Sequence, residues 1–171
     1  MTWTAPTPEP ADGPMTGPDR PLLEGFLGWQ RTTLLNVCAG LTAEQLAQRP
    51  LPSSNLSLLG LLRHAAKVER TWLRQRAAGE DVEPYFDPDL GPGHDFDHLD
   101  PAEAEDAERL LREEWLDADV AVAAMSFEDT FDVHGEEWSL RMVYVHLIAE
   151  YARHNGHADL LREAHDGVTG R

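Results

Sequence analysis

The sequence predicts an all-α protein: a four-helix bundle with a short extra helix and a long acidic loop. Four long stretches carry apolar residues at helical spacing, and each is bounded by a capping residue, a proline or a glycine. Only residues 127–138 alternate weakly, around His134-Gly135, as in a short hairpin. Helices with one apolar stripe bury it by packing against each other, which favours a bundle.

The first long helix is expected near 21–39 and ends at Gly40. Its inward face consists of Leu23, Phe26, Leu27, Gln30, Leu34, Val37 and Cys38. Trp29 and Leu22 lie off this face. Exposed apolar groups of this kind can mark an interface, so we expect a homodimer.

A short helix near 42–48 should begin at the capping-box sequence Thr42-Ala43-Glu44-Gln45. The second long helix is expected over 57–78, with Gly79 ending it and with the apolar face Leu61, Ala65, Val68 and Trp72. His64 falls within that face. Because an unpaired buried imidazole is costly, His64 needs a partner, either a backbone carbonyl or a bound metal.

The segment 79–100 holds three prolines, three glycines and eight acidic residues, with no Lys or Arg. A connection of this length is usually functional or disordered. Tyr85, Phe86 and Phe96 suggest a lid over a site; a solvated acidic loop is the alternative. The third long helix should follow over 101–125, with the inward face Ala104, Ala107, Leu111, Trp115, Ala118, Val122 and Met125.

The last helix is expected over 139–165, capped by Ser139 and ended by Gly167. Its predicted apolar stripe is Val145, Ile148, Ala149, Ala152, Gly156 and Leu160, and beside it run His146, Glu150, His154 and His157. From their order along the chain, we expect the four long helices to be antiparallel.

Composition narrows the class of protein. Residues 1–19 contain five prolines and few aliphatic groups, which predicts a disordered tail before a helical domain over 20–171. A net charge of −17 argues against binding nucleic acid or anionic membranes. Neither a membrane-spanning run nor a signal peptide is evident, and the single cysteine, Cys38, fits a reducing compartment. We therefore expect a cytoplasmic protein.

The polar stripe of the last helix has the spacing of a metal site. Glu150 and His154 are four residues apart, as are His146 and Glu150, while His154 and His157 are three apart. Helical neighbours at these spacings can share one ion. Two histidines and a carboxylate form a common catalytic set for zinc and other divalent metals. A solvated His/Glu-rich face is the alternative.

Two segments resemble a known family. HLIAEYARHNGHADLLRE (146–163) is similar to the last helix of the DinB/YfiT-like superfamily of metal-binding four-helix bundles. It is closest to the actinobacterial branch that includes mycothiol-dependent maleylpyruvate isomerase. SLLGLLRHAAKVERTWL (57–73) resembles the second helix of the same group.

The resemblance implies that His64, Glu150 and His154 are the metal ligands. Many relatives have a third histidine where this chain has Glu150, and Glu150 matches the pattern of the mycothiol-dependent enzyme. His157 stands where many relatives carry Gln, so we expect it to orient a ligand. His146 is expected either to orient Glu150 through a hydrogen bond or to be an interior histidine with a backbone partner.

The resemblance also implies a function. The metal would be zinc, with nickel, manganese or iron as alternatives, and it would activate a low-molecular-weight thiol of the mycothiol type. The thiol would attack an electrophilic small-molecule substrate in a transfer, conjugation or isomerisation. The alternatives are a metal-hydroxide hydrolase and a non-catalytic, stress-related metal-binding domain.

Overall fold

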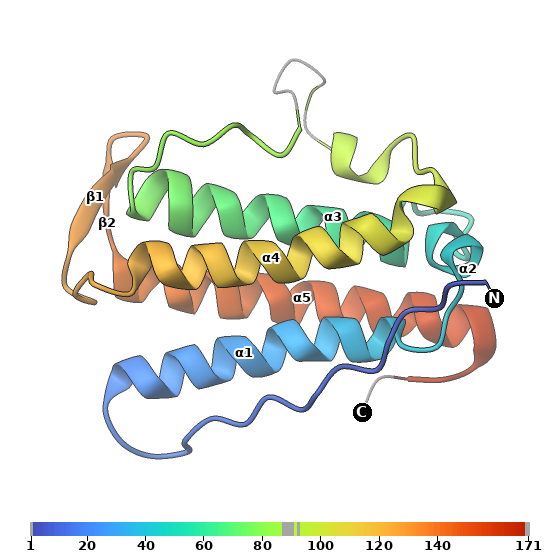
Figure 1. Ribbon diagram of the computed structural model, residues 1–171, viewed down its shortest axis with the longest axis horizontal. Helices are drawn as coiled ribbons and strands as arrows, with labels where there is room; N and C mark the ends of the chain where they lie inside the picture. The colour runs from blue at the N-terminus through green and yellow to red at the C-terminus, as the bar shows by residue number, and fades with distance from the viewer. Residues whose placement is uncertain (1, 87–90, 92, 170–171) are drawn as a thin grey trace.

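Four long helices form a bundle in the computed structural model, which describes residues 2–86, 91 and 93–169 (Figure 1). They are α1 (Asp19–Cys38), α3 (Leu58–Glu69) with its π-helical continuation η1 (Arg70–Ala77), α4 (Ala104–Val122) and α5 (Leu140–Asp166). The predicted all-α bundle and its helices are therefore confirmed, with boundaries shifted by a few residues. None of the described helices has the length and apolarity needed to cross a membrane.

The shorter elements connect these helices. They are α2 (Ala43–Ala47), the 3₁₀ turns η3 (His94–Phe96) and η4 (Pro101–Glu103), and the antiparallel strands β1 (Thr130–Val133) and β2 (Glu136–Ser139). The predicted capping box at Thr42 is present. His134 and Gly135 both have positive φ, 56° and 88°. A two-residue turn with positive φ at both positions matches the twist of the strands in a β-hairpin. The hairpin that the weak alternation of residues 127–138 indicated is therefore present.

Helices α1 and α5 run in the same direction. Asn155 donates to Gln30, and further along both helices Arg162 donates to the backbone oxygen of Val37. Both pairs are separated by 125 residues, a constant offset that only parallel helices give. The expectation that the bundle is antiparallel throughout was wrong here.

Helices α3–η1 and α4 are parallel as well. Arg70 donates to Glu114, 44 residues later, and Arg74 to Asp117, 43 residues later. Since these two helices are consecutive, the chain must return the length of the bundle between them. The segment 79–100 joins them, and its described residues, 79–86, 91 and 93–100, lie on the α3 side of the bundle (Figure 1). We call this segment the crossover loop. The loop must be long because the two helices it connects are parallel. The order of the helices along the chain does not reveal this.

The buried face of α5 differs from the predicted apolar stripe. Val145 and Leu160 are 43% and 56% exposed. The buried residues are Leu140, Val143, Tyr144, Leu147, Tyr151, Asn155, Ala158 and Leu161. Apolar residues occupy several sides of this helix, and the hydroxyls of Tyr144 and Tyr151 weaken the hydrophobic signal of the face that is actually buried. The polar stripe borders this true core face, which brings it towards α3.

The N-terminal segment follows a path along α1, in contrast to the predicted disordered tail. Ala5 is buried, its amide donates to the Leu41 carbonyl, and its carbonyl accepts from the Gly40 amide. Gly13 and Gly25 approach so closely that a Cβ on either would lie 2.6 Å from the other's Cα. The prediction of disorder counted only the apolar side chains of this segment. The contacts of Ala5 depend instead on backbone hydrogen bonds, and that of Gly13 with Gly25 depends on the absence of side chains.

Candidate metal centre

His64, Glu150 and His154 converge between α3 and α5. The Oε1 atom of Glu150 lies 3.2 Å from Nε2 of His64 and 3.1 Å from Nε2 of His154. The three side chains are only 14–17% exposed. The three residues that the family resemblance implies as ligands therefore lie close together. Glu150 and His154 are one turn apart on α5, and His64 faces them from α3.

The spacing of these atoms fits a divalent cation. One nitrogen or oxygen from each residue lies within 4.8 Å of the others. Bonds of about 2.0–2.2 Å to a tetrahedral zinc place neighbouring ligand atoms about 3.3 Å apart. The two measured distances to Glu150 fall close to that value, so the donor set needs little rearrangement to hold an ion.

Asp95, which the sequence analysis did not single out, holds His64 from behind. Its Oδ2 lies 2.6 Å from Nδ1 of His64 and accepts from Nζ of Lys67 at 2.8 Å. Burial acts to raise the pKa of Asp95, but the hydrogen bonds and charges of His64 and Lys67 outweigh it and hold that pKa well below its usual range. The ionised carboxylate therefore fixes a proton on Nδ1.

This fixed proton supports a cation in the site. In the tautomer that carries its proton on Nδ1, His64 presents the lone pair of Nε2 to the carboxylate oxygen of Glu150. Two acceptors at 3.2 Å repel each other unless a cation, either a proton or a metal ion, lies between them. A carboxylate that binds the second nitrogen of a histidine is the usual support of a metal-ligating imidazole.

His154 has a comparable second partner. Its Nδ1 lies 3.4 Å from Nδ1 of His157, which leaves Nε2 directed at Glu150. Burial, reinforced by the neighbouring His64, lowers the pKa of His154 to about 4. His154 is therefore neutral near pH 7, the form that binds a metal. His157 thus lies next to His154, and its role in orienting a ligand stays a prediction.

His146 does not orient Glu150 through a hydrogen bond, as one expectation required. Its ring packs against Trp72 at 4.4 Å and Trp138 at 5.7 Å between centroids. Within the described part of the chain, no hydrogen bond joins His146 to Glu150; instead, Arg153 donates to the other carboxylate oxygen of Glu150. Aromatic packing has taken the place of the predicted hydrogen bond, because residues 72 and 138 reach this turn of α5 from two other elements.

The long crossover loop forms one edge of the site. The Phe96 ring lies 5.4 Å from that of His64, and its edge lies so close to Gly60 that a Cβ there would clash at 2.6 Å. Arg49 donates to the Phe96 carbonyl, and Arg63 donates to the carbonyls of His94 and Asp97. Phe96 thus lies beside the centre, as the lid hypothesis requires, and Gly60 is what lets it approach.

A buried charge network lies behind the centre and was also missed. Glu69 is fully buried and accepts two hydrogen bonds from Arg31, at 2.7 and 2.8 Å. It also accepts from the hydroxyl of Tyr151, which in turn accepts from Trp115. Glu69 stands four residues after Ala65 and so lies on the apolar face of α3. A carboxylate on that face was the sequence signal that could have predicted a buried ion pair.

The remaining candidates lie elsewhere. His94 and His98 pack against each other in the crossover loop, 6.1 Å between centroids. Among the described residues, the only cluster of His, Cys, Asp and Glu with ligand spacing is His64, Glu150 and His154. Cys38 is buried, and burial raises the pKa of its thiol to about 12, so it is not a nucleophile near neutral pH.

A bundle that gathers two imidazoles and a carboxylate between facing helices has the architecture of a metal-binding helical-bundle protein. The family model of the mycothiol S-transferases matches residues 22–167, and the chain therefore belongs to that family. The match includes α3–η1, α4, α5, both strands and all but the first three residues of α1, and it confirms the resemblance seen in the sequence. No curated protein and no solved structure matches the chain.

Proposed function

We propose that this protein is a metal-dependent transferase that joins the sulfur of mycothiol to an electrophilic small molecule. The observation that carries the proposal is the convergence of His64, Glu150 and His154 on one point, in a chain of the mycothiol S-transferase family. Zinc fits two nitrogens and one oxygen, and nickel, manganese and iron accept the same donors.

The side chains have distinct roles in this proposal. A divalent cation at the centre, when bound, lowers the pKa of a coordinated thiol so that it reacts as the thiolate. Asp95 keeps the His64 proton on Nδ1, and Nδ1 of His154 lies 3.4 Å from Nδ1 of His157, so both Nε2 atoms face the cation. Glu150 supplies the negative charge that a divalent cation needs.

The substrates reach the centre from the solvent side. The cavity beside the three ligands is lined by Leu34, Leu61, Ala65, Val68 and Tyr151 and has a volume of only about 10 Å³. That volume holds no more than about one water molecule. The partly exposed edge of the ligands, beside the exposed Arg153 and below Phe96, is therefore where thiol and electrophile would meet.

A conjugation assay tests the proposal. Zinc-loaded protein is mixed with 1-chloro-2,4-dinitrobenzene and mycothiol, with equimolar cysteine, or with no thiol. Transfer forms a carbon–sulfur bond and releases chloride and a proton. We expect thioether formation with mycothiol at a rate at least about tenfold above that with cysteine, and loss of that rate in Glu150→Gln. Glu163→Gln, an exposed change on the same helix, is the matched control.

The other outcomes separate the alternatives. Protein-dependent consumption of the electrophile without any thiol would contradict thiol transfer and support a metal-hydroxide hydrolase. Stoichiometric zinc binding without turnover of this or other electrophiles would contradict catalysis and support a metal-binding domain. Retention of full activity by Glu150→Gln would show that the centre is elsewhere.

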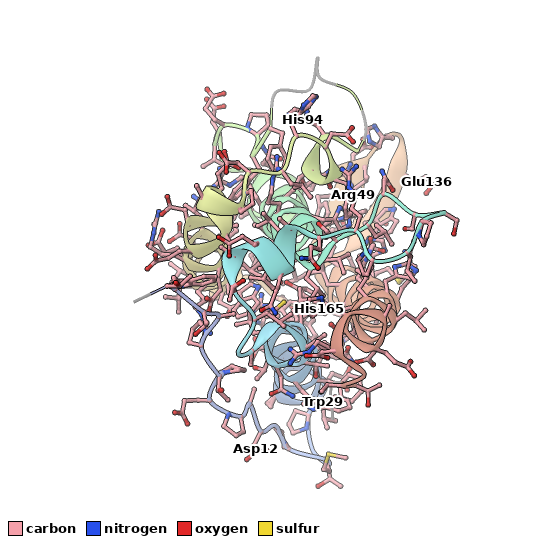
Figure 2. The ribbon with its side chains drawn as sticks, turned by 90° about the vertical axis from the view of Figure 1, so that its right-hand side faces the viewer. Asp12, Trp29, Arg49, His94, Glu136 and His165 are labelled. Atoms are coloured by element: carbon pink, nitrogen blue, oxygen red, sulfur yellow. The ribbon has the colours of Figure 1, made fainter. Side chains whose placement is uncertain are left out.

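We also propose a homodimer. Trp29 is half exposed on the outer side of α1, away from the bundle core and near Asp12 (Figure 2). Phe26 and Met15 are exposed nearby, beside the same N-terminal segment. Contiguous apolar exposure of this kind favours an interface. Light scattering at micromolar concentration should give twice the chain mass; a monomeric mass would refute the dimer.

A further inference from the structure

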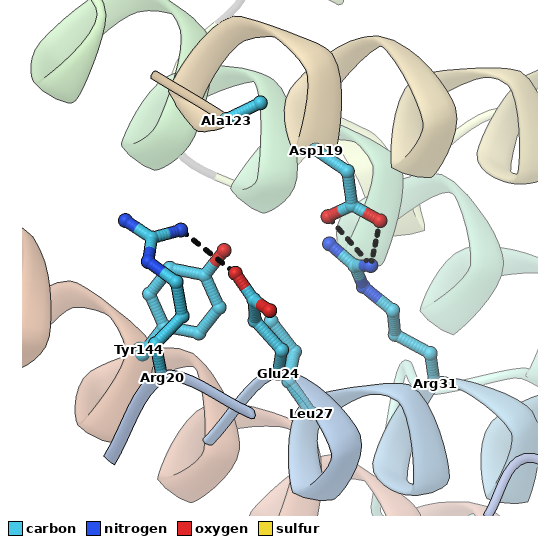
Figure 3. Close-up of a pocket in the computed structure, with 7 residues that line it drawn as sticks. All are labelled: Arg20, Glu24, Leu27, Arg31, Asp119, Ala123 and Tyr144. Atoms are coloured by element: carbon cyan, nitrogen blue, oxygen red, sulfur yellow. Dashed lines mark hydrogen bonds and ion pairs between the residues drawn. The ribbon is translucent and has the colours of Figure 1, made fainter. Parts of the chain in front are cut away.

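A second cavity, of about 390 Å³, lies between α1, α4 and α5 (Figure 3). Its polar lining comes from Arg20, Glu24 and Arg31 of α1, Asp119 of α4 and Tyr144 of α5. It shares no lining residue with the cavity beside the metal centre. Its size lies in the range of small-molecule pockets.

Tyr144 gives this cavity an unused hydrogen-bonding group. Its side chain is 2% exposed, and Figure 3 shows it turned from α5 towards the cavity. The hydroxyl makes no hydrogen bond to any residue in the described ranges. Burial raises the pKa of Tyr144 well above its usual value, so the group stays a neutral donor and acceptor. The hydroxyl opens into the cavity, where a bound ligand would give it a hydrogen-bond partner.

The charges around the cavity favour a positive ligand. Arg20 pairs with Glu24, and Arg31 pairs with both Asp119 and the fully buried Glu69. The cavity itself is lined by two guanidinium groups and two carboxylates. Glu69 lies behind Arg31 and neutralises it, which leaves Asp119 as the carboxylate in excess. The net charge of −17 adds a field that attracts cations.

The charged side chains that line the cavity differ in how freely they can change conformation. Arg31 is fixed by its two hydrogen bonds to Glu69. The carboxylates of Glu24 and Asp119 are 43% and 51% exposed, and ion pairs at that exposure are weak. These two carboxylates can therefore turn from the guanidinium groups to a ligand at little cost.

We propose that this cavity is a second binding site, which takes a small molecule that carries an ammonium group. Glu24 and Asp119 accept from the ammonium, and the Tyr144 hydroxyl bonds to it or to a neighbouring polar group of the ligand. The guanidinium of Arg20 lies on the same wall and would add affinity for a zwitterion, which carries a carboxylate beside its ammonium.

Three probes that share a four-carbon frame test the proposal on the full-length protein. They are butylammonium, the zwitterion 2-aminobutyrate, and butyrate, each titrated at constant ionic strength and followed by protein NMR. We expect saturable shifts centred on the cavity residues for an ammonium-bearing probe and none for butyrate. Tighter binding of butylammonium would identify a simple amine as the ligand class, and tighter binding of 2-aminobutyrate an amino acid.

Two substitutions give the matched comparison. Tyr144→Phe keeps the ring and should weaken binding about fivefold, the loss expected for one hydrogen bond. Asp119→Asn should weaken it about tenfold or more because it removes a charged acceptor. Asp117→Asn, an exposed change on the same helix that does not line the cavity, should have no effect.

Two results would overturn the site. One is the absence of saturable shifts with both ammonium probes. The other is binding that Tyr144→Phe and Asp119→Asn leave unchanged while both variants keep the wild-type NMR spectrum. The proposal stands apart from the conjugation assay, so neither experiment depends on the other.

Discussion

Asp95 and His64 are joined by a short hydrogen bond, with Oδ2 2.6 Å from Nδ1, although they lie 31 residues apart. The contact ties the crossover loop to α3, and it decides which nitrogen of His64 faces Glu150. An acidic loop that looks like solvated chain in the sequence therefore supplies a supporting group of the candidate metal centre.

Replacing Asp95 by Asn should weaken metal binding about 10–100-fold, the usual effect of losing the carboxylate behind a ligating histidine. A neutral amide no longer fixes the Nδ1 proton by charge, and it also removes the charged partner of Lys67. Competition with a chromophoric zinc chelator measures the affinity. Asp97→Asn, two residues along the same loop and exposed, is the control and should bind like wild type. Equal affinities for all three proteins would remove Asp95 from the account.

The two buried tyrosines of α5 should respond differently to loss of their hydroxyls. Tyr151 donates to Glu69 and accepts from Trp115, so Tyr151→Phe leaves two buried groups short of a partner. We expect a loss of about 1–3 kcal/mol in the free energy of unfolding. Tyr144→Phe removes a hydroxyl without a described partner and should change it by less than about 0.5 kcal/mol. Urea denaturation compares them, and equal losses would contradict the network.

The metal-free protein should lose stability as the pH falls from about 6.5 to 4. The pKa of His154 is about 4 in the folded chain against an ordinary 6.5, so the unfolded chain takes up its proton first. The stabilisation from this difference is complete above pH 6.5 and is lost as the pH falls to about 4. It amounts to at most about 3 kcal/mol.

The measurement for this pH prediction is urea denaturation of chelator-treated protein at several pH values. His154→Gln cannot titrate, so its stability should depend less on pH within this window. The pKa values of Asp95 and Glu150 are also lowered, and their contributions are lost below about pH 4.5, outside most of the window. Parallel pH curves for wild type and His154→Gln would show that His154 is not held neutral.

Local signals predicted the helices well, because caps and stops act within a few residues. The capping box at Thr42, the cap at Ser139 and the left-handed Gly167 are all present where the sequence places them. The spacing of Glu150 and His154 likewise survives, since a helix fixes it.

Features that depend on distant parts of the chain were missed. The parallel direction of α3 and α4 follows from a loop that crosses the bundle, and Asp95 reaches His64 only because of that crossing. The buried face of α5 could not be read from hydrophobicity, because Tyr151 is buried through its bond to Glu69 on another helix. In each case a contact between remote residues outweighs the local pattern.

Metal binding by the chain tests the central claim most directly. Zinc is titrated into metal-free wild type and into His64→Ala, Glu150→Ala and His154→Ala, with His94→Ala and His165→Ala as controls that remove a histidine elsewhere. Circular dichroism confirms that each variant is folded. Wild type and both controls should bind one zinc ion per chain, and each of the three ligand variants should lose stoichiometric binding. If all five variants bind zinc as wild type does, His64, Glu150 and His154 are not the ligands, and the proposed thiol transfer loses its basis.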